Sequence, residues 1–176
     1  LYAHAYEAPN GTTTGGRWGS YSLPGASIQF VIDNIGPVAS NLVIDPSPNN
    51  GKSSQSGNLN FLDSLQLQAN LLDSASPIAS NIAGAEAFVT DTSKSPANAA
   101  DAALFTTGTG AEMIPAGAVW GDAPGKQAYA YIPLAVLTAY PDGPVRFWVH
   151  AQDVAGNWGP FAYTDLTVDR KAPVLT

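Results

Sequence analysis

The sequence predicts an all-β protein, and three observations lead to that prediction. Glycine and proline are abundant, with 17 and 14 residues in a chain of 176. Only 12% of the residues are charged while 45% are hydrophobic, which is typical neither of a disordered chain nor of long surface helices. Short segments in which apolar and polar residues alternate recur between turn signals, and such segments are typical of strands.

The charge balance and the missing cysteines limit the classes of function. The net charge is −7, and the seven Lys and Arg residues are scattered along the chain. Nucleic-acid binding needs clustered cations that neutralise phosphates, so we expect no nucleic-acid partner. Cysteine is absent, which excludes disulfides and zinc-thiolate sites. No apolar run approaches the length of a membrane span, and we expect no membrane insertion.

Two parts of the chain repeat one another in the same order. The matching segments are 1–5, 18–19, 30–33 and 37–38 in the first part and 147–151, 158–159, 166–169 and 173–174 in the second. A repeat of this kind indicates a protein built from similar modules. We therefore expect residues 1–35 to be the C-terminal hairpin of a preceding module, and residues 36–176 to form one complete domain.

The expected hairpin begins with a strand at 1–7, passes through a loop at 9–16 and returns with a strand at 27–32. Its apolar face carries Leu1, Ala3, Ala5, Phe30 and Ile32. An isolated hairpin is marginal in water because such a face has no partner. Two arrangements would supply one: a longer tandem array, or strand addition to the sandwich of a neighbouring chain.

The second part is expected to contain about seven short strands. The clearest is 61–72, where Leu65, Leu67, Ala69 and Leu71 alternate with polar residues. The other expected strands are the segment from 38 to Pro46, 83–89, 127–133 and the two strands of a terminal hairpin at 147–174, with shorter strands at 103–105 and 112–114. A single helical turn is expected at 134–140.

This pattern predicts a Greek-key β-sandwich of the immunoglobulin type, with a closed barrel as the alternative. The terminal hairpin favours the sandwich, because its two strands are tightly joined and a linker follows them. At its turn we expect the Asp153 carboxylate to accept backbone N–H groups, with Gly156 or Asn157 in the left-handed conformation. Trp158 is expected to seal this loop onto the core.

A family resemblance rests on these residues. The string DVAGNWG at 153–159, followed by a strand and by residues 168–169 and 172–173, together with 36–42, resembles the immunoglobulin-like repeats of large bacterial and archaeal cell-surface and secreted proteins. The match covers about a third of the second unit. The resemblance concerns the fold. Together with the unpartnered hairpin and the low charge, it leads us to expect an extracellular, non-enzymatic structural module, a tandem spacer or a surface-filament or surface-layer subunit, that acts in assembly or adhesion beside further copies of itself.

The acidic residues near the linker suggest a calcium site. Hard cations bind clustered oxygen ligands, and four such residues could meet at a junction between modules. These residues are Asp33, Asn34, Asp73 and Asp153. The alternative is that Asp153 only stabilises its own turn. No cofactor is required for the expected fold, and calcium is the one ion that the sequence suggests.

A second class of function is a carbohydrate- or peptide-binding accessory module of a secreted enzyme. Trp120 lies in the variable middle of the domain and is the one tryptophan that we consider for a ligand such as a glycan. The sequence contains no serine-hydrolase, zinc-protease or phosphate-loop motif. A pair of acids for glycoside hydrolysis is defined only in space, so the sequence does not exclude it. We predict that the chain is not an enzyme.

Overall fold

The structure is a computed structural model, and it describes residues 6–7, 17–18, 32–45, 52–53, 64–74, 79–117 and 119–169. The chain divides into two compact units, residues 1–32 and 33–176. The division falls just before Asp33. The linker residues 33–35, which the repeat placed with the preceding hairpin, therefore belong to the second unit.

The first unit contains a short two-stranded sheet. Strand β1 (Tyr6–Glu7) pairs in antiparallel fashion with β2 (Arg17–Trp18), and Tyr6 lies opposite Trp18. Of the expected apolar face, Leu1, Ala3, Ala5 and Phe30 lie outside the described residues, and Ile32 is exposed. Strand addition by this hairpin thus stays a prediction.

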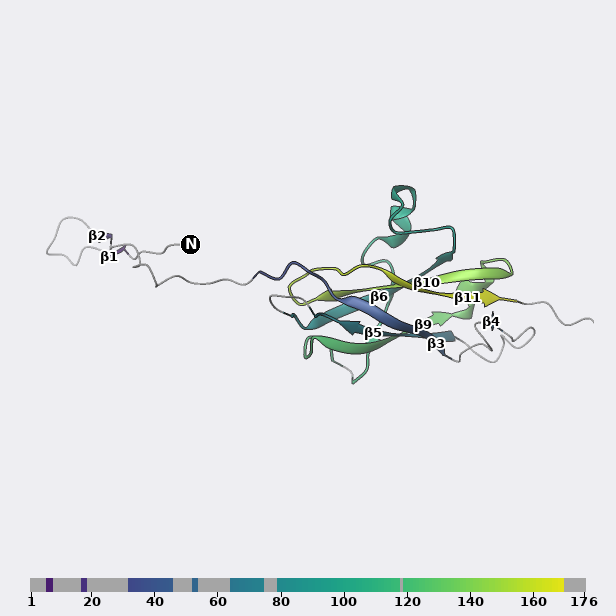
Figure 1. Cartoon of the computed structure of the whole chain (residues 1–176), viewed down its shortest axis with the longest axis horizontal. Helices are drawn as coiled ribbons and strands as arrows, with labels where there is room; N and C mark the ends of the chain where they lie inside the picture. The colour runs from purple at the N-terminus through teal and green to yellow at the C-terminus, as the bar shows by residue number, and fades with distance from the viewer. Residues whose placement is uncertain are drawn as a thin grey trace, which may run out of the picture. The chain divides into compact units, whose positions relative to one another are not determined.

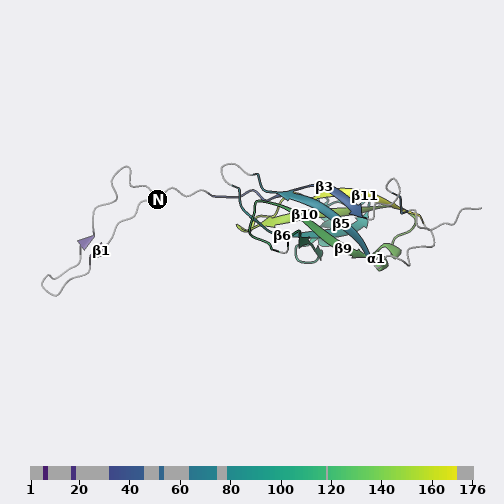
Figure 2. The same ribbon diagram turned by 90° about the horizontal axis from the view of Figure 1, so that it is seen from below.

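The second unit is a sandwich of two separate sheets, which confirms the all-β prediction (Figures 1 and 2). The four-stranded sheet has the order β3 (Val38–Asp45), β5 (Ser64–Leu72), β9 (Gly125–Pro133) and β8 (Ile114–Pro115). The five-stranded sheet has the order β4 (Lys52–Ser53), β11 (Ala162–Val168), β10 (Gly143–Asp153), β6 (Ile82–Asp91) and β7 (Ala111–Glu112). Within the sandwich all described pairs of neighbouring strands are antiparallel except β4 and β11.

The core between the sheets follows the period of two that strands impose on their side chains. On β5 the residues Leu65, Leu67, Ala69 and Leu71 are buried, as their alternation predicted. On β10 the inward residues are Val145, Phe147, Val149 and Ala151, and all of them are buried as well. Each sheet therefore contributes one apolar face to a continuous core.

The strand expected at 103–105 is absent, and this prediction is wrong. The segment is the 3₁₀ helix η3 (Ala99–Phe105), whose first turn is capped by the Asn98 side chain accepting a hydrogen bond from the Ala100 N–H group. The helix brings Phe105 onto the outer face of the five-stranded sheet, where it packs edge-on against Trp148 at 5.5 Å. This η3 excursion, the segment between β6 and β7 that contains the helix, therefore contributes to a second, smaller apolar cluster outside the main core.

In place of the one strand expected at 112–114, the structure has two short strands, β7 and β8, because the chain passes from one sheet to the other at this point. Residues of β7 pair with β6, whereas residues of β8 pair with β9, so the chain crosses from one sheet to the other between them. Met113 lies at the crossing and is buried. The single helical turn expected after β9 is present as α1 (Leu134–Thr138).

Candidate metal centre at the linker

The linker lies against the loop between β10 and β11, and two glycines make this approach possible. A Cβ atom on Gly159 would lie 1.6 Å from the carbonyl oxygen of Pro37, and one on Gly36 would lie 2.4 Å from the Gly159 nitrogen. The Asn157 amide adds a hydrogen bond of 3.1 Å to the carbonyl oxygen of Asp33. Because no side chain fits between the two backbones, the path of the linker is fixed before it enters β3.

The turn itself is built as the sequence predicted. The Asp153 carboxylate accepts hydrogen bonds from the Asn157 backbone N–H group at 2.8 Å and from its side-chain amide at 3.0 Å. Gly156 adopts φ of +94°, a conformation that glycine takes at little cost. Asp153 is thus held in one orientation at the end of β10.

Three of the four predicted calcium ligands meet at this point. One carboxylate oxygen from each of Asp33, Asp73 and Asp153 lies within 4.8 Å of the other two. Asp33 comes from the linker, Asp73 follows β5, and Asp153 ends β10. Asp73 is 2% exposed, and Asp153 has no exposed area. The sequence therefore predicted a cluster that only the folded chain brings together.

Hydrogen bonds hold the three carboxylates in place. The Ser80 N–H group donates to Asp73 at 2.7 Å, and the Ser80 hydroxyl donates to Asp33. The Ile35 N–H group donates to the other oxygen of Asp33 at 3.2 Å. The predicted ligand Asn34 is exposed and makes none of the described hydrogen bonds with the cluster. The Asn157 side-chain amide donates to Asp153 and to the Asp33 carbonyl oxygen instead, and Ser80 is a member of the cluster that the sequence did not predict.

The electrostatics of the cluster favour a cation. Two unit charges about 4 Å apart repel by about 4 kcal/mol at the effective dielectric constant of a protein surface. Buried carboxylates need a compensating charge, and clustered hard oxygen atoms are the ligands that Ca²⁺ prefers.

Beside the turn, Trp158 packs differently from the prediction. It stacks on the ring of His150 at a centroid distance of 4.2 Å, on the outer face of the sheet rather than on the main core. Phe161 also stacks on His150, at 4.1 Å. The sequence did not show which face Trp158 would join, because the apolar cluster on this side of the sheet also needs Phe105 from the distant helix η3.

His150 is a packing residue with an unusual environment. It is 2% exposed, and its Nε2 atom is a buried polar atom with no hydrogen-bond partner among the described residues. Burial lowers the pKa of His150 from 6.5 to about 4, although the nearby Glu86 carboxylate opposes the shift. The ring is therefore neutral near pH 7.

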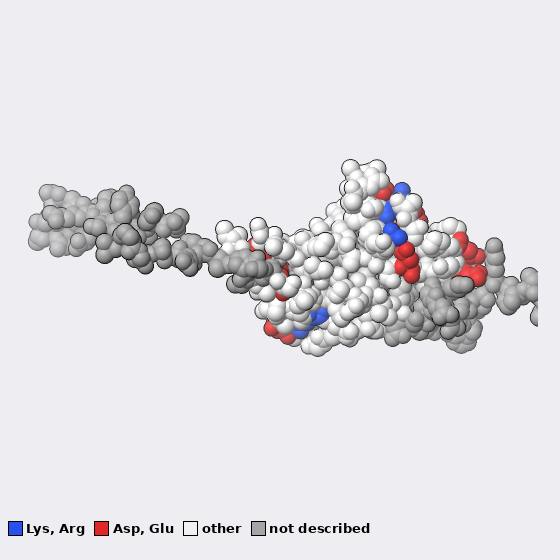
Figure 3. Space-filling view, viewed as in Figure 1, with Lys and Arg blue, Asp and Glu red and all other residues white. Residues whose placement is uncertain are grey.

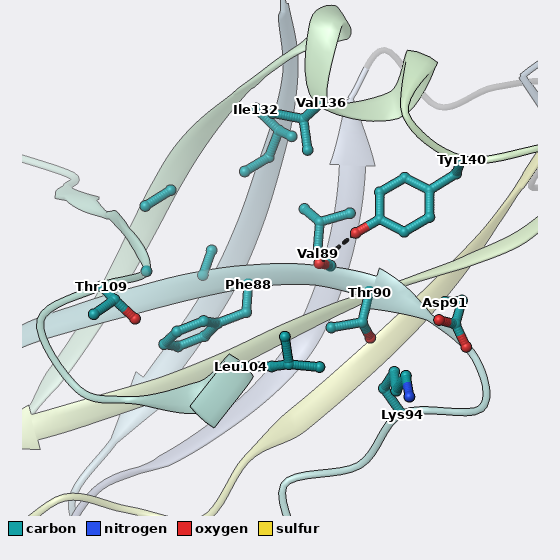
Figure 4. Close-up of a pocket in the computed structure, with 13 residues that line it drawn as sticks. Phe88, Val89, Thr90, Asp91, Lys94, Leu104, Thr109, Ile132, Val136 and Tyr140 are labelled. Atoms are coloured by element: carbon teal, nitrogen blue, oxygen red, sulfur yellow. Dashed lines mark hydrogen bonds between the residues drawn. The ribbon is translucent and has the colours of Figure 1, made fainter. Parts of the chain in front are cut away.

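Two further regions bear on ligand binding: Trp120, which the sequence analysis singled out, and a groove on the surface of the sandwich. Trp120 is half-buried and packs against the main core, so much of its surface is already in contact with protein. A groove of about 470 Å³ lies between β6, the η3 excursion and α1, and its lining is mostly apolar (Figure 4). There the Tyr140 hydroxyl donates to the Val89 carbonyl oxygen at 2.8 Å. Among the described residues that line this groove, Asp91 is the one acid.

Comparison with known protein families, with characterised proteins and with solved structures finds no match for this chain. Among the described residues no helix has the length and apolar character needed to cross a membrane. A functional proposal for the chain must therefore be built from the geometry of its own residues.

Proposed function

We propose that this chain carries an immunoglobulin-like structural module of an extracellular tandem array, and that calcium fastens the incoming linker to the sandwich. The ion would be held by Asp33, Asp73 and Asp153. The module acts as a non-enzymatic spacer, and its partners are neighbouring modules of the same kind.

The order of the strands supports the immunoglobulin-like part of the proposal. Immunoglobulin constant-type sandwiches pair strands A, B, E and D in one sheet and C, F and G in the other. Here β3, β5, β9 and β8 follow the first order, and β11, β10 and β6 follow the order G, F and C. The two sheets also face each other across one apolar core, as such sandwiches require.

The meeting of three carboxylates carries the calcium part of the proposal. Asp73 directly follows β5 and Asp153 ends β10, and these are inner strands of the two sheets, while Asp33 belongs to the linker that precedes β3. A cation bound by all three would join the linker to both sheets at once. A stiff junction is what a spacer needs, because a flexible one would let neighbouring modules bend relative to one another.

The internal repeat supports the tandem part. In the alignment of the two copies, Asp33 corresponds to Asp169, which directly follows β11. Asp33, which contributes a carboxylate to the cluster, thus has a counterpart in Asp169 at the end of the last strand of the domain. The absence of cysteine and the low charge suit an exposed module of simple composition.

Calcium titration of the full chain by calorimetry tests the proposal. We expect one calcium ion per chain, and we expect Asp73→Asn and Asp153→Asn each to weaken binding at least about tenfold, because each removes one anionic ligand. Asp122→Asn is the matched control, since it removes an acid whose partner is Lys126 and that lies outside the cluster. Absence of binding, or equal binding by all three variants, would contradict the proposal.

A further inference from the structure

The outer face of the four-stranded sheet differs from the rest of the surface in its chemistry. The residues that point outward at its centre form three cross-strand pairs of β5 and β9: Gln66 with Tyr131, Gln68 with Tyr129, and Asn70 with Gln127. All six are uncharged, whereas Asp45 of the flanking strand β3 lies in register with Gln66 at one end of the row. In a chain of net charge −7, such a face is a distinct feature.

The arrangement of polar and apolar residues on this face is the reverse of a protein interface. Protein interfaces have an apolar centre and a polar rim, and they are enriched in Arg and Trp. Here amides and phenols occupy the two central strands, whereas exposed aliphatic residues lie on the flanking strands β3 and β8, for example Val43 and Ile114. The centre therefore presents hydrogen-bonding groups rather than an apolar anchor.

These central side chains are already positioned by one another. The Gln68 side-chain amide donates to the Gln66 side-chain oxygen at 3.0 Å, and the Gln66 side-chain amide donates to the Tyr131 hydroxyl at 3.0 Å. The Tyr129 hydroxyl donates to the Gln127 side-chain oxygen at 2.9 Å. Fixed side chains lose little conformational entropy when a ligand binds, so the row is prepared for recognition.

The chemistry of the row suits a polyhydroxyl ligand. Each amide offers both donors and acceptors, which matches hydroxyl groups that do the same. Tyr129 and Tyr131 are two residues apart on β9, so about 6.7 Å separates them along the strand, and their rings provide apolar surface beside polar tips. A face without a cation on an acidic protein disfavours anionic polymers.

We propose that this face binds a neutral polysaccharide chain lying across β5 and β9, with Tyr129 and Tyr131 contacting sugar rings and Gln66, Gln68, Asn70 and Gln127 bonding to hydroxyl groups. This site is separate from Trp120 and from the calcium cluster. The outer face of the other sheet differs in its chemistry, because there Phe105 packs on Trp148 and the charged pair of Arg146 and Asp165 lies beside Tyr163. Figure 3 shows how much of the visible surface is free of Lys, Arg, Asp and Glu, which cluster in a few places.

Native affinity electrophoresis of the full chain tests the proposal. The gels contain one soluble neutral polymer each, namely xylan, mixed-linkage β-glucan, galactomannan or amylose, and alginate serves as the anionic comparison. We expect retardation in at least one neutral gel and none in alginate. We expect Tyr131→Ala and Gln68→Ala each to raise the dissociation constant at least about tenfold, because each removes a direct contact with the sugar chain.

Tyr163→Ala is the matched control. Tyr163 lies on the other sheet and is 53% exposed, against 54% for Tyr131, so both variants remove equally exposed rings. We expect Tyr163→Ala to bind as the unaltered chain does, with all variants checked for folding by circular dichroism. No retardation in any neutral gel, or equal retardation of the Tyr131 and Tyr163 variants, would overturn the proposal. A dimer that Tyr131→Ala dissociates would also overturn it, because the face would then be a protein interface.

Discussion

Replacement of Gly159 by alanine is expected to lower the free energy of unfolding by at least about 3 kcal/mol. The new methyl group would lie 1.6 Å from the Pro37 carbonyl oxygen and 2.7 Å from the Pro37 carbonyl carbon. Both atoms belong to the backbone, so no side-chain rotation can relieve the clash. The linker would have to leave the loop, and the contact between Asn157 and Asp33 would be lost with it.

Urea unfolding followed by tryptophan fluorescence measures this effect. Gly84→Ala is the control, because a Cβ atom on Gly84 would meet nothing within 4 Å. We expect that variant to be as stable as the unaltered chain or slightly more stable, since alanine restricts the unfolded chain more than glycine does. Equal stability of the two variants would show that the linker is not seated against the loop.

Acidification from pH 7 to pH 4 is expected to remove roughly 2–3 kcal/mol of stability through His150 alone. Burial lowers the pKa of folded His150 to about 4, whereas the unfolded residue has a pKa near 6.5. Between these values the unfolded chain binds a proton that the folded chain does not. The contribution of neutral His150 is therefore complete above pH 6.5 and is lost as the pH falls towards 4. Glu86 is the charged group that acts on the ring, and its attraction for a proton reduces the loss.

The variant His150→Phe isolates this effect. Phenylalanine can keep the stacking with Trp158 and Phe161, removes the unpartnered Nε2 atom and does not titrate. Melting temperatures are compared between pH 7 and pH 4 in the presence of chelator, so that metal ligands contribute nothing to the difference. We expect the variant to lose clearly less stability than the unaltered chain. Parallel pH profiles would show that His150 is not buried as a neutral ring.

Local patterns in the sequence were enough to predict the sandwich. The alternation in β5 predicted which of its side chains are buried, and the DVAGNWG string predicted the role of Asp153 and a left-handed residue at Gly156 or Asn157, which is Gly156 in the structure. In each case the decisive interactions connect residues close together in the chain, so propensity and turn chemistry fix them.

The candidate site was predictable only in part, because its members are joined across long sequence distances. Asp33, Asp73 and Asp153 were selected as oxygen ligands placed near strand ends, and the fold brings them together. Ser80 lies in a connection without any distinctive motif, and its place depends on how β5 and β6 are joined. The covering of His150 by Trp158 and Phe161 depends likewise on which sheet face the η3 excursion closes.

The outer face of the four-stranded sheet shows another limit of sequence reasoning. Alternation predicted that Gln66, Gln68 and Asn70 point outward from β5, but not that Tyr129 and Tyr131 lie beside them. Register between distant strands is set by the packing of the whole core, and it decides which polar residues become neighbours.

Melting with and without calcium tests the claim that the ion holds the linker to the sandwich through Asp33. With free calcium at 100 times its dissociation constant, binding to the native state alone predicts about 2.7 kcal/mol of added stability over the chelated protein. Asp33→Asn should retain the fold and show a clearly smaller gain. Melting curves that coincide in calcium and in chelator would contradict the claim. An equal gain in stability for Asp33→Asn would show that calcium does not hold the linker through Asp33.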